Sequence, residues 1–216
     1  MKKIVILVSG RGSNMEAMLA ARAAGQLPVE IAAVISNRPD AKGLETAANA
    51  GIATRSLDHK AYASREDFDH ALAACIDEFS PDLVVLAGFM RILTPDFVRH
   101  YEGRLLNIHP SLLPSFPGLH THQRALDEGV RIHGCTVHFV TAELDHGPVV
   151  IQAAVPVLDS DDESTLAARV LRQEHSIYPQ AVRWFAEGRL RLEGGKVRLA
   201  AELVADCALI APQLAG

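Results

Sequence analysis

The first half of the chain alternates short runs rich in β-branched residues with alanine-rich segments that carry a helical pattern. Such alternation is typical of βαβ units, in which parallel strands share one sheet and helices cover both faces. We expect strands at residues 3–9, 30–36, 53–57, 83–87 and 105–109, and helices at residues 14–24, 44–50, 65–79 and 95–101. The pattern therefore predicts an α/β, Rossmann-like fold with a twisted, mostly parallel sheet.

The pattern of the chain changes after residue 109. Pro110, Pro114, Pro117 and Gly118 interrupt the segment that follows, so we expect a stiff loop without regular structure there. Further strands are expected at residues 135–140 and 149–155, joined by a turn at residues 145–148 that is short enough for antiparallel neighbours. A long helix at about residues 165–187 and a terminal hairpin around residues 194–195 complete the expected elements.

Charge and cysteine content exclude several kinds of partner. The net charge is −5 at pH 7, and the acidic and basic residues are interspersed, so no basic block is available for the phosphates of a nucleic acid. The apolar run at residues 4–8 is too short for a signal peptide, and no run approaches a membrane span. Cys75, Cys135 and Cys207 are widely spaced, which favours reduced thiols. We expect a soluble, cytoplasmic protein that binds neither nucleic acid nor a membrane.

A glycine-rich turn at residues 9–14, Ser-Gly-Arg-Gly-Ser-Asn, joins the first expected strand to the first expected helix. Free backbone N–H groups and the helix dipole make such a turn a favourable seat for an anion. Met15 stands where a dinucleotide fingerprint needs its third glycine, and the turn lacks the Gly-Lys-Ser/Thr ending of a P-loop. NAD and ATP are therefore disfavoured, while a simple turn capped by Ser13 or Asn14 stays an alternative.

Asn107 and His109 form a polar pair at the end of the fifth expected strand. Residues two apart in a strand share a face, and the carboxyl ends of strands in an open α/β sheet are where ligands bind. Asp145, in the turn between the two later strands, can reach this pair only if those strands continue the sheet beside the fifth. A strand end with satisfied polar side chains is the structural alternative.

Acyl transfer to an amine needs a donor to the oxyanion, a proton for the leaving nitrogen and an acceptor for the proton of the amine. Asn107 can donate from its amide, a charged His109 can donate and pass a proton, and Asp145 can favour that charged form and hold a water molecule. Ser111 and Ser115 sit in no Gly-x-Ser-x-Gly elbow, which argues against a serine hydrolase. The three residues therefore fit a direct attack by an amine.

Several histidines cluster in the sequence after His109, and histidine is a common metal ligand. The pair His120 and His122 falls in the expected loop, with no HExxH motif and no cysteine pair nearby. We therefore expect no metal, and we expect His120 and His138 to support the site.

Four segments of the sequence occur in the order and spacing of one family. They are residues 10–14 (Gly-Arg-Gly-Ser-Asn), 87–93 (Ala-Gly-Phe-Met-Arg-Ile-Leu), 107–114 (Asn-Ile-His-Pro-Ser-Leu-Leu-Pro) and 143–148 (Glu-Leu-Asp-His-Gly-Pro). From about residue 3 to residue 190 the chain resembles the phosphoribosylglycinamide formyltransferases, folate-dependent enzymes of purine biosynthesis. Methionyl-tRNA formyltransferases share the third segment, but they are longer and carry a nucleic-acid-binding domain.

The resemblance implies the substrates and the residues that hold them. 10-Formyltetrahydrofolate would be the formyl donor, and the amine of 5-phosphoribosylglycinamide (GAR) would be the acceptor. The residues implied for GAR are Gly12, Ser13 and Asn14 at the phosphate and Leu171, Arg172, Gln173 and Glu174 at the glycinamide end, with Glu174 beside the amine. The residues implied for folate are Arg65 at the glutamate tail and Met90, Arg91, Ile92, Leu93, Asn107, Val140, Thr141, Ala142, Glu143, Leu144 and Asp145 around the pterin.

One domain of residues 1–216 is expected, with a phosphate-binding half (1–104), a catalytic and folate-binding half (105–190) and a variable tail (191–216). Such an enzyme would be a monomer or a homodimer. Arg11 and His146 depart from residues common in the family, which leaves their effect on affinity open. A formyltetrahydrofolate hydrolase and a noncatalytic folate-binding protein are the alternative functions.

Overall fold

The structure, a computed structural model, describes residues 1–200 and 209–212. Cys207 and the parts of the expected tail at residues 201–208 and 213–216 lie outside this range. No helix in the described range is long and apolar enough to cross a membrane.

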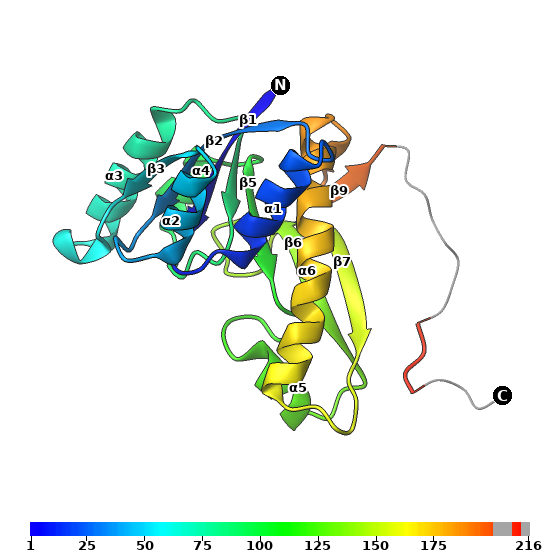
Figure 1. The fold of residues 1–216 in the computed structure, drawn as a ribbon. Helices are drawn as coiled ribbons and strands as arrows, with labels where there is room; N and C mark the ends of the chain where they lie inside the picture. Colours follow the sequence, from blue (N-terminus) through cyan, green and yellow to red (C-terminus); the bar gives the residue numbers. More distant parts are fainter. Residues whose placement is uncertain (201–208, 213–216) are drawn as a thin grey trace.

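A seven-stranded sheet forms the centre of the molecule (Figure 1), and its strand order is β3-β2-β1-β4-β5-β6-β7. The strands from β3 to β5 are parallel to their neighbours, and β6 and β7 continue the sheet in antiparallel pairing. The predicted fold class is confirmed. The strand bounds are β1 (Lys2–Val8), β2 (Val29–Ser36), β3 (Ala53–Ser56), β4 (Leu83–Leu86), β5 (Leu105–His109), β6 (Ile132–Phe139) and β7 (Val149–Pro156).

Helices cover both faces of this sheet because successive strand residues point to opposite sides. Ile4, Ile6 and Val8 of β1 pack into one core, whereas Val5 and Leu7 pack into the other. The first core lies under α1 (Ser13–Ala23), α2 (Lys42–Asn49), α5 (Thr121–Asp127) and α6 (Glu163–Ala186). The second core lies under α3 (Arg65–Asp77) and α4 (Pro95–His100).

The structure adds two short helices that the sequence pattern did not predict. The segment after His109 was expected to lack regular structure, but α5 begins at Thr121, and the 3₁₀ helix η1 spans His59–Ala61. His122 therefore lies in α5 rather than in a loop. The predicted terminal hairpin is confirmed by β8 (Leu190–Glu193) and β9 (Lys196–Leu199).

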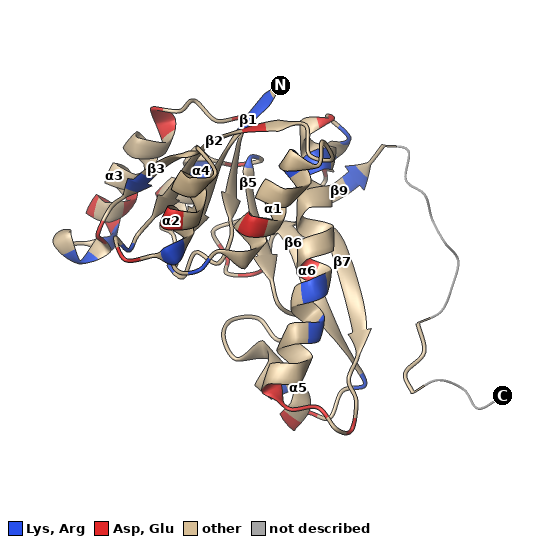
Figure 2. Cartoon of the chain, in the orientation of Figure 1, with Lys and Arg blue, Asp and Glu red and all other residues tan. Residues whose placement is uncertain are grey.

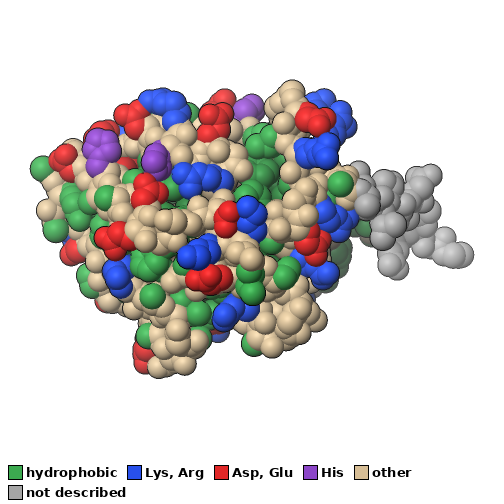
Figure 3. Space-filling view, turned by 90° about the horizontal axis from the view of Figure 1, so that it is seen from above, with side chains coloured by type: hydrophobic (Ala, Val, Ile, Leu, Met, Phe, Trp, Pro, Cys, Tyr) green, Lys and Arg blue, Asp and Glu red, His purple; other side chains and the backbone are tan. Residues whose placement is uncertain are grey.

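Charged side chains of both signs are spread over the fold. Figure 2 shows Lys and Arg beside Asp and Glu on most helices, and Figure 3 shows the same mixture on the face seen from above. On the face shown in Figure 3, basic and acidic side chains are therefore interspersed.

Tyr178 connects helix α6 to the central strands β4 and β5 through its hydroxyl group. Its side chain is completely buried, and its hydroxyl lies 2.9 Å from the carbonyl oxygens of both Leu86 and Leu106. The hydroxyl has a single proton, so the two carbonyls share one donor. Leu86 is the last residue of β4 and Leu106 is the second residue of the adjacent strand β5, so Tyr178 fixes α6 against both strands.

We expect Tyr178→Phe to lower the free energy of unfolding by about 1–3 kcal/mol, because both buried carbonyls lose their shared donor. Chemical denaturation measures this difference. Tyr62→Phe is the matched control, since the hydroxyl of Tyr62 makes no hydrogen bond within the described chain. The centres of the Tyr62 and Phe68 rings are 5.5 Å apart, so the ring of Tyr62 is packed as well. Equal stability of wild type and Tyr178→Phe would contradict this role.

Candidate active site

Asn107 and His109 lie at the carboxyl end of β5, where β6 is the antiparallel neighbour. Asn107 is paired with His138 of β6, and His109 is paired with Thr136. The Asn107 amide nitrogen lies 3.3 Å from His138 Nε2, and no other hydrogen bond to the Asn107 side chain occurs in the described chain. One amide N–H and the amide oxygen of Asn107 are therefore available to a ligand.

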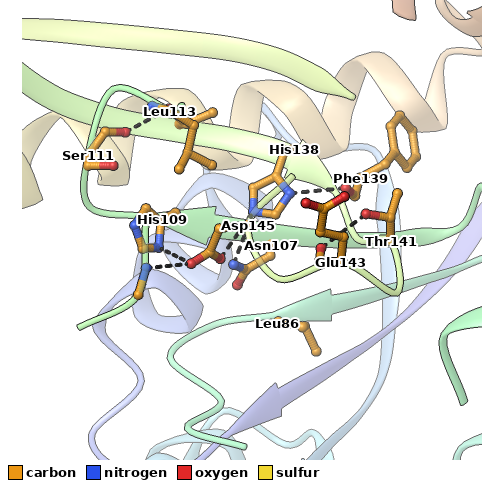
Figure 4. A network of polar contacts seen from close by, with 12 residues as sticks. Leu86, Asn107, His109, Ser111, Leu113, His138, Phe139, Thr141, Glu143 and Asp145 are labelled. Atoms are coloured by element: carbon orange, nitrogen blue, oxygen red, sulfur yellow. Dashed lines mark hydrogen bonds and ion pairs between the residues drawn. The ribbon is translucent and has the colours of Figure 1, made fainter. Parts of the chain in front are cut away.

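His109 lies between two oxygen atoms of the protein (Figure 4). Its Nδ1 is 3.5 Å from Asp145 Oδ2, and its Nε2 is 3.0 Å from the carbonyl oxygen of Phe116. The side chains of His109 and Asp145 are each only 7% exposed. Carboxylate and carbonyl oxygens only accept hydrogen bonds, so a charged imidazolium can donate from both nitrogens. The distance between Asp145 and His109, which the sequence left open, is that of an ion pair.

Asp145 reaches His109 because two loops hold its carboxylate in place. The backbone of Asp145 has φ 53°, a left-handed conformation that aspartate tolerates better than most residues, and its Oδ2 accepts the Gly118 N–H at 2.9 Å. Two residues later, a Cβ at Gly147 would overlap the carbonyl oxygen of Phe139, so only glycine fits there. The proline-rich loop after β5 and the loop between β6 and β7 thus close on the same carboxylate.

The glycine-rich turn keeps its backbone donors available. Gly12 is the N-cap of α1 with φ 73°, and no side chain caps the helix. Ser13 and Asn14 are thus the first helical residues, and the expected alternative, a turn capped by either of them, is wrong. The turn lines a cavity of about 510 Å³ that also includes Gly88, Met90 and Arg38 in its wall. A helix N-terminus open to such a cavity is a suitable seat for a phosphate.

The wall of this cavity does not include Asn107, His109 or Asp145, the residues expected to be catalytic. Ala87 and Gly88 follow β4 and line the cavity, and Leu86 is the partner of Asn107 in the pairing of β4 with β5. An anion in the turn after β1 and a reacting group beside Asn107 of β5 would therefore lie on either side of β4.

Asn14 connects the turn to the long helix α6. Its side-chain nitrogen donates to Glu174 Oε2 at 2.7 Å, although the two residues are 160 positions apart in the chain. Both side chains are buried, and burial raises the pKa of the Glu174 carboxyl above its ordinary value. Asn14 Oδ1 is buried without a hydrogen-bond partner in the described chain, so an acceptor is left for a ligand there.

The segments expected to bind folate carry exposed apolar side chains. Met90, Ile92 and Leu144 are large apolar side chains that are 68%, 60% and 56% exposed. The Met90 N–H donates to the Ser9 hydroxyl at 2.7 Å, which ties this segment to the end of β1. A contiguous patch of exposed apolar side chains is typical of a ligand-binding surface, and these three residues are candidates for one.

Two arginines expected to bind folate lie at the start of α3 or pack against it: Arg65 was expected at the glutamate tail, and Arg91 was expected around the pterin. Arg65 is the first residue of α3 and is exposed. Arg91 stacks on Phe68, one turn further along α3, at 4.9 Å from the ring centre, and its Nε is buried without a partner in the described chain. An anionic group would give this donor the acceptor that it lacks.

The other expected site residues lie on α6 and in the segments that follow β4 and β6. Leu171 and Gln173 are partly buried on α6, and Arg172 is exposed. Thr141 donates to the Glu143 carbonyl at 3.1 Å within the β6–β7 loop. The remaining expected folate residues in these segments are Leu93, Val140 and Ala142.

The two residues that depart from the family pattern pair with acidic neighbours. Arg11 lies 3.2 Å from Glu16, and His146 lies 3.9 Å from Glu143. The Arg11 side chain is 75% exposed, so its charge is largely solvated.

His122 and His133 form a second histidine pair near the site. His133 Nε2 is 3.2 Å from His122 Nδ1, and burial lowers the pKa of His133 to about 4. Within residues 1–200 and 209–212, no three His, Cys, Asp or Glu side chains are grouped so that they could hold a metal ion.

Comparison with known proteins identifies the family of the chain. A family profile described as formyl transferase matches residues 2–182. This chain is a member of the formyl transferase family. The match includes Asn107, His109, Asp145 and Glu174.

Formyl transferases that resemble this chain over most of their length include a curated enzyme and a crystal structure. The phosphoribosylglycinamide formyltransferase of Escherichia coli (strain K12) is 57% identical over 189 residues, covering 88% of this chain and 89% of that enzyme. The crystal structure of glycinamide ribonucleotide transformylase 1 from Symbiobacterium toebii has a TM-score of 0.90 at 50% identity, covering 92% of this chain and 94% of that one.

The crystal structure of a formyltetrahydrofolate deformylase from Pseudomonas putida KT2440 has a similar fold. Its TM-score is 0.82 at 30% identity, and the match covers 92% of this chain and 70% of that chain. Proteins named as a transformylase and as a deformylase therefore share this fold, so the fold alone does not identify the acceptor of the formyl group.

Proposed function

We propose that this chain transfers the formyl group of 10-formyltetrahydrofolate to the amine of GAR, giving formyl-GAR and tetrahydrofolate in purine biosynthesis. The 57% identity to the E. coli phosphoribosylglycinamide formyltransferase over most of both chains carries this proposal. The geometry around Asn107, His109 and Asp145 supports the chemistry that the proposal requires.

In the proposed reaction the amine nitrogen of GAR attacks the formyl carbon, and the formyl oxygen takes the negative charge. The open N–H of Asn107 donates to this oxyanion, and an imidazolium at His109 donates as well once its Nε2 leaves the Phe116 carbonyl. Asp145, 3.5 Å from His109 Nδ1, supplies the counter-charge. Breaking the bond from the formyl carbon to N10 of folate requires a proton on that nitrogen, and the attacking amine releases one.

The seat proposed for GAR spans the turn and α6. Backbone N–H groups of Gly12, Ser13 and Asn14 bind the phosphate at the N-terminus of α1. Glu174, held by Asn14, accepts a hydrogen bond from the amine. Leu171, Arg172 and Gln173 lie within one turn of Glu174 and complete the glycinamide end of the seat.

The seat proposed for folate lies between the segment after β4 and the β6–β7 loop. The apolar side chains of Met90, Ile92 and Leu144 cover the pterin, and backbone groups of both segments bind its polar edge. Arg65 binds the carboxylate of the glutamate tail, for which a guanidinium is well suited. The other proposed contacts are Arg91, Leu93, Asn107, Val140, Thr141, Ala142, Glu143 and Asp145.

We expect Glu174→Gln to raise the KM for GAR by about tenfold, since the amine loses a charged acceptor.

The Glu174→Gln variant should be more stable than wild type at neutral pH. Burial raises the folded pKa of Glu174 above its ordinary value, so the wild type loses stability as pH rises through the raised pKa. The melting temperatures of wild type and Glu174→Gln should converge at acidic pH, where the Glu174 carboxyl is protonated in both the folded and the unfolded chain. A constant difference between them at all pH values would contradict the burial argument.

A single assay tests the function. The chain is mixed with 10-formyltetrahydrofolate, with and without GAR, and the formation of tetrahydrofolate is followed. Turnover that requires GAR supports the transferase, turnover without GAR supports the hydrolase, and none in either mixture supports a noncatalytic binding protein. A cytoplasmic location, a monomer or homodimer, and the division at residues 104 and 190 stay predictions.

A further inference from the structure

His138 is buried opposite Asn107, and each of its ring nitrogens lies near a polar atom of the protein (Figure 4). Its side chain is 2% exposed. His138 Nδ1 lies 3.0 Å from the carbonyl oxygen of Phe139, and Nε2 lies 3.3 Å from the amide nitrogen of Asn107. The same nitrogen, Nε2, lies 4.0 Å from Asp145 Oδ1. His138 thus contacts two of the three proposed catalytic residues.

The partners of His138 determine where its proton lies. A carbonyl oxygen only accepts, so Nδ1 carries the proton and donates it to Phe139. In a neutral ring, Nε2 then has a lone pair, which accepts an N–H of Asn107. Burial lowers the pKa of His138, so the neutral ring is the form present at physiological pH.

This arrangement also determines the orientation of the Asn107 amide. If the amide turned over, its oxygen would face the lone pair of His138 Nε2, and two acceptors would oppose each other. The amide nitrogen therefore stays toward β6, with one N–H bound to His138. The second N–H is the donor that the proposed reaction requires.

We propose that His138 is a positioning residue whose Nε2 holds the Asn107 amide so that its second N–H points at the formyl oxygen. This inference rests on the proposed role of Asn107 in formyl transfer. In this role His138 contacts neither substrate. The pairing of Asn107 with His138 across β5 and β6 sets their separation, so the hydrogen bond exists before substrate binds.

Two variants of similar shape separate positioning from packing. His138→Gln places an amide oxygen near the position of Nε2 and keeps an acceptor for Asn107, whereas His138→Met fills similar space without one. We expect His138→Met to lower kcat by about tenfold, with the KM of both substrates within about twofold of wild type. His138→Gln should keep kcat within about threefold of wild type.

Melting temperatures and far-ultraviolet circular dichroism must show that both variants are folded before the rates are compared. Equal losses in the two variants would overturn the proposal, since a packing defect alone would explain them. Wild-type kcat in His138→Met, or an effect confined to KM, would overturn it as well.

A second measurement does not depend on turnover. Nitrogen-15 NMR of the wild-type chain, labelled at histidine, reports which ring nitrogen of His138 is protonated. We expect Nδ1 to be protonated and Nε2 to be free of a proton at neutral pH. The opposite tautomer would overturn the positioning role even if formyl transfer is confirmed, while absence of turnover with the expected tautomer would contradict the proposed function alone.

Discussion

Replacing Asn107 with alanine is expected to lower kcat for formyl transfer by about a hundredfold, because removing one preorganised oxyanion donor costs about that much. Asn107 is the only proposed donor whose side chain has an N–H free of other partners in the described chain. The fold should survive, because the lost contact is a single hydrogen bond to His138. Steady-state kinetics with both substrates saturating give kcat directly, and a melting curve tests the fold.

Asn49→Ala is the matched control for this variant. Asn49 is exposed at the end of α2, so the same chemical change there should leave kcat and stability near the wild-type values. If Asn107→Ala retained more than about a third of wild-type kcat, Asn107 could not be the oxyanion donor. If it raised only the KM for folate, Asn107 would bind the donor without acting in the transition state.

The central strands were predictable because their residues are apolar on both faces. The strands expected at residues 3–9 and 83–87 agree with β1 and β4 to within two residues. Buried parallel strands read as continuous β-branched runs, and short glycine-ended helices separate them. Helix α5 was missed because it is short, has a left-handed N-cap residue at His120, and follows a segment interrupted by prolines.

The chemical types in the site were also predictable, but their distances were not. Asn107 and His109 share a strand, so their common direction follows from the period of two. Asp145 reaches His109 only because β6 and β7 add to the sheet beside β5 and the loop adopts a left-handed turn at Asp145. The antiparallel register that sets this distance depends on long-range packing, which no local pattern contains.

Two further contacts had no local signal in the sequence. Asn14 and Glu174 meet because α1 and α6 pack on the same face of the sheet, and nothing near either residue indicates this pairing. His138 is opposite Asn107 through the register of β5 and β6. The resemblance to the family suggested Asn14 and Glu174, and the run of histidines in the sequence suggested His138. Only the fold shows which residue each of them contacts.

Asp145→Asn is expected to lower kcat by about a hundredfold, for two reasons that follow from the contacts of the carboxylate. The variant removes the charge that faces His109 Nδ1, so a charged imidazolium loses its counter-ion. If the remaining oxygen keeps the Gly118 N–H, the new amide nitrogen takes the position of Oδ1, 4.0 Å from His138 Nε2. There it competes with Asn107 for the same lone pair.

Asp159→Asn is the control, because it removes the same charge from an exposed residue whose only ion pair among the described residues is with Arg131. It should leave kcat unchanged. Structural effects of Asp145→Asn should be small, since the substitution preserves shape and the hydrogen bond from Gly118. A loss of kcat with a normal melting temperature would therefore locate the effect in the reaction. Near-wild-type turnover would mean that His109 acts without a carboxylate partner, and the direct-attack mechanism would then need another source for its counter-charge.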